Sequence, residues 1–250
     1  MDAGKALSSV RILGVRVDDV TMAETLDLFQ AWITEGETHQ VVTVNPEFVM
    51  RAQQDAGFRV TLEEADLAVP DGAGLLWASR LLGHRLRERV AGSDLLPLAA
   101  ELSAAHGYRI FLLGAAPGVA ERTAELLTQR YPKAVFAGTY AGSPAISDEE
   151  EIVERIRAAR PDLLFVAYGA PKQDLWIRRN AARLEVPVCM GVGGAFDFIA
   201  GVARRAPLWM RRAGLEWLHR LIQEPWRWRR MLALPRFAGA VLWSACGRAR

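Results

Sequence analysis

Four short segments that are rich in polar residues or glycine each come directly after an apolar stretch. They are residues 43–47, 70–74, 169–174 and 191–197. In open α/β sheets, ligands bind beyond the carboxyl ends of the strands, where the first N–H groups of the next helix are free. The segments therefore predict one site at one edge of a sheet, with backbone N–H groups available to an anionic ligand.

Asp71 carries the most specific chemistry in these segments. It precedes a predicted helix, so it is either an N-cap, which stabilises a helix by about 1 kcal/mol, or a carboxylate that accepts a proton from a substrate hydroxyl. Asn45, directly before Pro46, is either the cap of its helix or a pocket residue. Thr43 is either an ordinary β-branched strand residue or part of the same site.

Arg89 and Gln173 also have a structural and a functional interpretation. Arg89 either forms an exposed ion pair with a local acid or is a fixed cation that stabilises the charge on a diphosphate leaving group. Gln173 either caps its helix or contacts the same ligand. The glycine stretch with Gly191, Gly193 and Gly194 is a weak signal by itself.

Several common kinds of site are absent from the sequence. Residues 114–118 hold only part of the GxGxxG pattern of dinucleotide sites, and no GxxxxGK[ST] motif occurs. The four histidines are isolated from one another, and no Asp-x-Asp pair is present. We therefore predict neither a metal site nor a cofactor.

The elements that position these residues follow an alternating pattern. Apolar stretches predict strands at about 10–17, 40–44, 65–69, 108–113, 134–137, 163–168 and 186–190, and helical patterns lie between them. The strands are apolar throughout, which is typical of a parallel sheet covered on both faces. The predicted fold class is α/β, a Rossmann-like and mostly parallel sheet with helices on both faces.

Residues 204–250 differ in composition from the rest of the chain. They hold eleven arginines and two acids, a formal charge of +9 against +2 for the whole chain, and five of the eight tryptophans. Arginine binds phosphate through a planar fork of donors, and tryptophan favours membrane–water interfaces. We predict a catalytic domain over 1–203 and a basic amphipathic helical appendage over 204–250 that lies on a membrane. Nucleic-acid binding is the other interpretation of such arginines, and the dense tryptophan content favours the membrane.

Within this appendage, some residues should pack against other parts of the protein. Leucines and an isoleucine recur at helical spacing, at Leu208, Leu215, Leu218 and Ile222. No secretory signal is visible in residues 1–25, and no apolar run reaches the ~20 residues that span a bilayer. These features predict a cytoplasmic protein that is peripheral on the inner face of the plasma membrane.

Taken together, the ordered motifs resemble the bacterial WecG/TagA/CpsF glycosyltransferase family over about residues 10–230. The matching text includes TVNPE at 43–47, ADLAVPDG at 65–72, ERVAGSD at 88–94, GAPKQ at 169–173, GVGGAFD at 191–197, RAP at 205–207 and GLEWLHRL at 214–221. The resemblance implies an inverting enzyme that moves a sugar from a UDP-sugar to a polyprenyl-diphosphate-linked saccharide. The products of such enzymes belong to teichoic acid, common antigen, capsule or exopolysaccharide.

The resemblance also implies roles for individual residues. Asp71 is expected to be the base, with Thr43 and Asn45 in the pocket beside it. Arg89 and Gln173 are expected near the donor or its leaving diphosphate. The diphosphate itself is expected near the glycines of the last segment (Gly191, Gly193 and Gly194), and the lipid diphosphate and membrane near arginines of the tail (Arg211, Arg212, Arg220 and Arg227).

One other function remains open at this point: a membrane-attached, nucleotide-binding scaffold that catalyses nothing, because every site residue also has a capping or packing role. No feature of the sequence selects the transferred sugar or assigns a role to the residues beyond Met231. A homo-oligomer is compatible with the sequence, but no feature sets its size.

Overall fold

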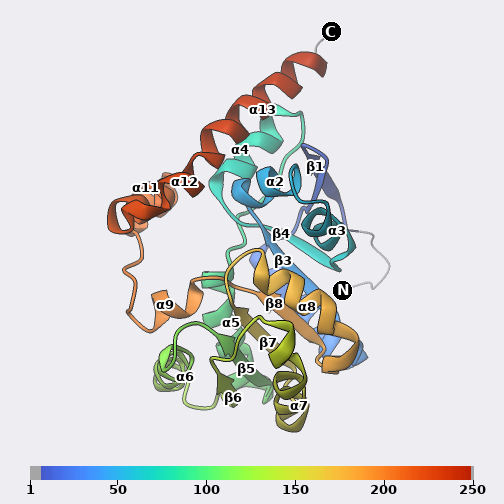
Figure 1. Ribbon diagram of the computed structural model, residues 1–250, viewed down its shortest axis with the longest axis vertical. Coiled ribbons are helices and arrows are strands. Elements are labelled where there is room, and N and C mark those ends of the chain that lie inside the picture. The colour runs from blue at the N-terminus through green and yellow to red at the C-terminus, as the bar shows by residue number, and fades with distance from the viewer. Residues whose placement is uncertain (1–6, 249–250) are drawn as a thin grey trace.

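A six-stranded parallel sheet forms the centre of the molecule (Figure 1). The computed structural model describes residues 7–248. In spatial order the strands are β4 (Leu67–Pro70), β3 (His39–Val44), β8 (Val188–Gly191), β7 (Leu163–Ala167), β5 (Arg109–Gly114) and β6 (Val135–Tyr140). Every neighbouring pair is parallel. The predicted mostly parallel α/β sheet is confirmed.

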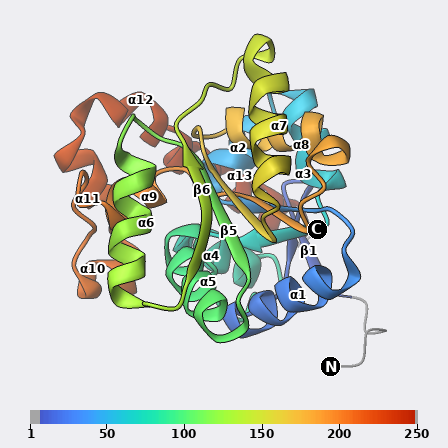
Figure 2. The ribbon, with the colours of Figure 1, turned by 90° about the horizontal axis from the view of Figure 1, so that it is seen from below.

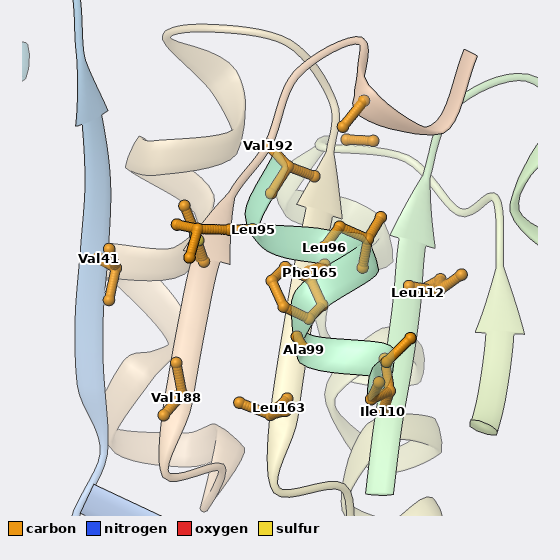
Figure 3. Packing of buried hydrophobic residues seen from close by; sticks show 14 of the residues in the cluster. Val41, Leu95, Leu96, Ala99, Ile110, Leu112, Leu163, Phe165, Val188 and Val192 are labelled. Atoms are coloured by element: carbon orange, nitrogen blue, oxygen red, sulfur yellow. The ribbon is translucent and has the colours of Figure 1, made fainter. Parts of the chain in front are cut away.

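Helices cover both faces of this sheet, which is why its strands are apolar throughout. One face packs against α1 (Met22–Glu35), α5 (Gly92–His106), α6 (Val119–Arg130) and α9 (Ala195–Ile199). Figure 3 shows Leu95, Leu96 and Ala99 of α5 over strand residues such as Phe165 and Leu112.

The other face packs against α2 (Pro46–Ala52), α3 (Ala56–Glu64), α4 (Ala73–Leu81), α7 (Glu149–Ala159) and α8 (Lys172–Leu184). In Figure 2, α6 and α7 lie on opposite sides of β5 and β6. The molecule is therefore a three-layer sandwich of helices, sheet and helices.

The predicted single strand at 10–17 is wrong. It is an antiparallel hairpin of β1 (Ser9–Ile12) and β2 (Val15–Asp18), separate from the main sheet. Ile12 pairs with Val15 across a two-residue turn, and both turn residues, Leu13 and Gly14, have positive φ (50° and 81°). This conformation matches the twist of the two strands and closes the hairpin. The glycine in an otherwise apolar run was the signal for it.

The C-terminal segment forms five short or medium elements. They are α10 (Leu208–Arg212), α11 (Glu216–Gln223), the 3₁₀ turn η2 (Pro225–Arg227), α12 (Trp228–Met231) and α13 (Ala233–Arg248). Helix α13 returns to the body and lies beside α2 and α4 (Figure 1). The helical character predicted for this segment is confirmed, while the division into domains 1–203 and 204–250 stays a prediction.

The packing residues of this segment are only partly the ones expected. Leu208 and Ile222 are 61% and 68% exposed. Phe237 and Val241 of α13 are instead buried in the cluster formed with α2, α3 and α4. Leu215 and Leu218, the other two residues of the predicted stripe, are half-buried, so only part of that stripe packs against the protein. Among residues 7–248, no helix is long and apolar enough to cross a membrane.

Candidate active site

A pocket of about 580 Å³ lies beyond the carboxyl ends of β3 and β4 and under the C-terminal segment. The body contributes Asn45, Asp71 and Arg89 to its wall, and the C-terminal segment contributes Glu216 and Arg220. The four predicted segments follow β3, β4, β7 and β8, which are neighbours in the sheet. The expectation that they meet at one sheet edge is therefore confirmed.

Asp71 stands on the pocket wall with its carboxylate unused by helix capping. Helix α4 begins at Ala73 with Gly72 as its cap residue, and it has no side-chain cap hydrogen bond. The backbone N–H of Asp71 donates to the carbonyl oxygen of Val44 at 2.7 Å, which holds the residue beside the end of β3. Of the two interpretations of Asp71, the N-cap is wrong, and the carboxylate is available to a ligand.

The surroundings of Asp71 favour a proton acceptor that works near neutral pH. Burial raises its pKa from 3.8 to about 7, and the nearby carboxylates of Glu216 and Asp94 act in the same direction. The cations Arg89 and Arg205 oppose this shift. A carboxyl group with such a pKa can exchange a proton at the pH at which cells operate.

Arg89 belongs to an ion-pair network that ties the C-terminal segment to the body. It donates to Glu216 (Nη1 to Oε2, 2.8 Å) and to Asp94 (Nη2 to Oδ2, 3.3 Å). Arg205 donates to both oxygens of Asp94 at 2.6 and 2.8 Å and lies 3.4 Å from Glu216. Arg89 thus pairs with two acids, of which Glu216 comes from the C-terminal segment. The network holds the Arg89 guanidinium at the pocket wall.

Asn45 and Thr43 lie beside Asp71 but already have partners. The Asn45 side chain accepts a hydrogen bond from the N–H of Phe48 at 3.0 Å, so it is the cap of α2 as well as a pocket residue. The Thr43 hydroxyl donates to the carbonyl oxygen of Gly191 at 3.3 Å and is almost fully buried. Thr43 therefore joins β3 to the end of β8 behind the pocket.

Gln173 and the glycines form a buried layer next to this contact. The Gln173 side chain is 1% exposed and accepts a hydrogen bond from the N–H of Gly193 at 2.9 Å. A Cβ atom on Gly191 would stand only 2.5 Å from Nε2 of Gln173, so that position has no room for a side chain. Gln173 thus positions the glycine loop, and a direct contact with a donor stays a prediction for Gln173, Gly191 and Gly193.

Arg220, one of the tail arginines predicted for the lipid, lies at the pocket wall. Nη2 of Arg220 is 2.7 Å from the place of a Cβ on Gly194, and its guanidinium lies 5.2 Å from the ring centre of Phe198. Its Nε is buried without a hydrogen-bond partner, and burial lowers its pKa, as does the charge of Arg230. Arg220 is therefore a cation placed between the glycine loop and the pocket.

Arg211 and Arg227, two further arginines of this prediction, are in ion pairs outside the pocket wall. Arg211 stands 3.7 Å from Asp94 as a further member of the ion-pair network. Arg227 pairs with Glu224, and burial together with the charges of neighbouring arginines lowers its pKa to about 10. The side chain of Arg212 lies outside the described part of the structure. Over residues 7–248, no group of three or more His, Cys, Asp or Glu residues is placed to hold a metal ion.

Comparison with known sequences assigns this architecture to a family. The profile of the "Glycosyl transferase WecG/TagA/CpsF family" matches residues 10–250. The chain belongs to this family. Two similar curated relatives, from Bacillus spizizenii and Staphylococcus aureus (strain MW2), are both named N-acetylglucosaminyldiphosphoundecaprenol N-acetyl-beta-D-mannosaminyltransferase. The first is 37% identical over 90% of this chain and 87% of the relative, and the second is 33% identical over 92% and 91%.

As a member of the WecG/TagA/CpsF family, the protein is a glycosyltransferase. The family profile continues to residue 250, so the prediction that the resemblance ends near residue 230 is wrong. This agrees with the packing of α13, whose Phe237 and Val241 complete the core next to the pocket.

Four charged residues of the site were not predicted from the sequence. Asp94, Arg205 and Glu216 form the network around Arg89, and each lies in a motif that carried the family resemblance. Asp174 is fully buried, both its oxygens have no hydrogen-bond partner, and burial raises its pKa to about 7. Its only signal in the sequence was an acid directly after Gln173 in an otherwise buried segment.

Proposed function

We propose that this glycosyltransferase moves a sugar from a UDP-sugar to a saccharide on polyprenyl diphosphate, with inversion at the anomeric carbon. The names of the relatives make N-acetylglucosaminyl-diphospho-undecaprenol the first acceptor to test and UDP-N-acetylmannosamine the first donor. Their β-linked product agrees with inversion, since UDP-sugars of this kind carry the nucleotide in the α position. The product would be an early intermediate of a cell-surface polysaccharide.

The observation that carries the proposal is the free carboxylate of Asp71 in a pocket with Arg89 and Arg220. Asp71 accepts the proton of the acceptor hydroxyl while that oxygen attacks the anomeric carbon from the face opposite UDP. The bond between the anomeric carbon and the diphosphate oxygen breaks, and UDP leaves with the electron pair. Arg89 and Arg220 stabilise the negative charge that develops on this oxygen.

We also propose that the protein works as a peripheral protein on the inner face of the plasma membrane. Four tryptophans of the C-terminal segment are strongly exposed: Trp209, Trp226, Trp228 and Trp243. Exposed tryptophan next to arginine suits the interface of a bilayer with anionic lipids. An acceptor anchored in that bilayer would then be presented to the pocket beneath the segment.

The test is a UDP-release assay with a panel of UDP-sugars and a short-chain polyprenyl-diphosphate-GlcNAc acceptor. We expect acceptor-dependent release with one donor, and a decrease of about 10²–10⁴-fold in Asp71→Asn, the range that general-base catalysis contributes. Glu154→Gln, a change at an exposed acid on α7, is the matched control and should keep normal turnover.

Near-normal turnover of Asp71→Asn would remove Asp71 from the role of base. Binding of UDP without release for any donor and acceptor would instead favour the non-catalytic scaffold.

A further inference from the structure

A second pocket, of about 740 Å³, lies on the other side of the C-terminal segment from Asp71. Both pockets include Glu47 in their walls. Around the junction of α12 and α13, Met231 and Leu234 line the Asp71 pocket, while Ala233 and Arg236 line the second one. The two pockets are therefore adjacent and use different faces of the same segment, where α13 runs beside α2 and α4 (Figure 1).

The second pocket is rich in arginine from two distant parts of the chain. Its wall contains four arginines, Arg51, Arg229, Arg230 and Arg236, and two acids, Glu47 and Asp55. Not all of these arginines are neutralised by the acids, since the formal charge of the lining is positive.

Two of the four cations have no acidic partner within residues 7–248. Arg230 donates to Glu47 at 2.7 and 3.0 Å, and Arg51 lies 3.7 Å from Asp55. Arg229 instead lies over the ring of Trp228, at 5.5 Å from its centre, and Arg236 makes no ion pair within the described residues. Arg229 and Arg236 thus present unused guanidinium donors, the groups that bind phosphate oxygens in a bidentate manner.

The proposed reaction brings together two substrates that each carry a diphosphate. Arg89 and Arg220 lie in the pocket with Asp71, where the donor diphosphate has to leave. A second diphosphate in the same pocket would be repelled by the first, and it needs cations of its own. The second pocket supplies such cations next to the first, so that the sugar of an acceptor bound there can extend past Glu47 toward Asp71.

We propose that Arg229 and Arg236, with Arg51 opposite them, bind the diphosphate of the lipid-linked acceptor. This inference rests on the proposed function. It assigns the acceptor to other arginines than those expected from the sequence. Arg211 and Arg227 are in the wall of neither of these two pockets, and Arg220 lies at the glycine loop. The exposed ring of Trp228 beside Arg229 provides an apolar surface for the first units of the polyprenyl chain.

The test compares Arg229→Gln, Arg236→Gln and the double variant with Arg122→Gln, a change at an exposed arginine on α6. UDP release is measured with the short-chain acceptor in detergent micelles, with acceptor and donor varied separately. We expect each single variant to raise the KM for the acceptor about 10-fold and to leave the KM for the donor unchanged, as for the loss of one charged hydrogen-bonding group. Arg122→Gln should change neither constant.

Two results would overturn the inference. One is a normal acceptor KM in detergent combined with weaker binding of the variants to phosphatidylglycerol vesicles, which would assign the arginines to bilayer headgroups. The other is a rise in the donor KM instead of the acceptor KM, which would place them in the donor site.

A direct binding measurement separates this inference from the proposed function. Titration of the full chain with the short-chain polyprenyl-diphosphate lipid in detergent needs no turnover. Binding by the unchanged protein that the double variant loses would support the pocket even if no donor gave UDP release. Equal binding by both proteins would overturn the pocket and leave the transferase proposal standing.

Discussion

At the scale of single residues, the site depends on how the pKa of Asp71 is set. Burial moves it to about 7, while the guanidinium of Arg89 pulls it down. Asp71 is therefore protonated in the free enzyme at acid pH and ionised at alkaline pH. A base acts only in its ionised form, so activity should be lost as the pH falls through the raised pKa.

The pH dependence of kcat/KM for UDP release should show this titration. We expect the value to rise about 10-fold per pH unit below about pH 7 and to level off above it. In Arg89→Gln the inflection should move to higher pH, because the cation that lowers the pKa of Asp71 is gone. An inflection near pH 4 in the unchanged enzyme would contradict the burial of this carboxyl group.

At the scale of elements, the carboxyl end of β8 decides the shape of the glycine loop. Gly191 ends the strand, and Gln173 at the start of α8 holds the next turn through Gly193. A Cβ on Gly191 would meet Nε2 of Gln173 at 2.5 Å and Oδ1 of Asp174 at 2.6 Å, and both of these side chains are buried. A side chain there must push α8 away from β8.

Gly191→Ala should lower the free energy of unfolding by about 1–3 kcal/mol, the usual effect of overpacking a buried site, and weaken UDP binding with it. Gly239→Ala is the matched control, because Gly239 is in helix α13 with no atom within 4 Å of its Cβ position. This control should be neutral or more stable by about 0.5–1 kcal/mol. Denaturant unfolding and UDP titration of both variants provide the comparison, and equal stability of the two would argue against the close contact at Gly191.

At the scale of the whole molecule, the C-terminal segment is joined to the body by two different kinds of contact. The ion-pair network links Arg89 and Asp94 to Arg205 and Glu216 near the pocket. Helix α13 adds apolar contacts with α2 and α4 through Phe237. Its opposite side exposes Trp243, which is 84% accessible. The same helix can therefore stabilise the fold and present an apolar side chain to a membrane.

Phe237→Ala and Trp243→Ala should separate these two roles. Loss of the buried ring should lower the free energy of unfolding by about 3–5 kcal/mol. Loss of the exposed Trp243 ring should change the free energy of unfolding by less than about 0.5 kcal/mol. The same change should reduce sedimentation of the protein with anionic vesicles. Vesicle binding that is unaffected by Trp243→Ala would place the membrane contact elsewhere in the segment.

The sequence by itself determined the class of the fold and the edge at which the site lies. Continuous apolar strands between helices need cover on both faces, and parallel strands bring their carboxyl ends to one edge. For this reason Asn45, Asp71, Gln173 and Gly191 could be predicted to lie near one another. The predicted family also followed from motifs in their order along the chain, without any contact between them.

Only the tertiary structure decided which side chains cap a helix, which acids pair with an arginine and which side chains are buried. Asp71 follows a strand in the same way as a capping residue does, and only the start of α4 at Ala73 leaves its carboxylate free. Arg89 has an acid next to it in the sequence, yet it pairs with Asp94 and with Glu216, which is 127 residues away. The burial of Phe237 likewise depends on α2 and α4. Local sequence patterns report local hydrogen bonds and periodicity, whereas burial and ion pairing arise from segments that meet only when the chain has folded.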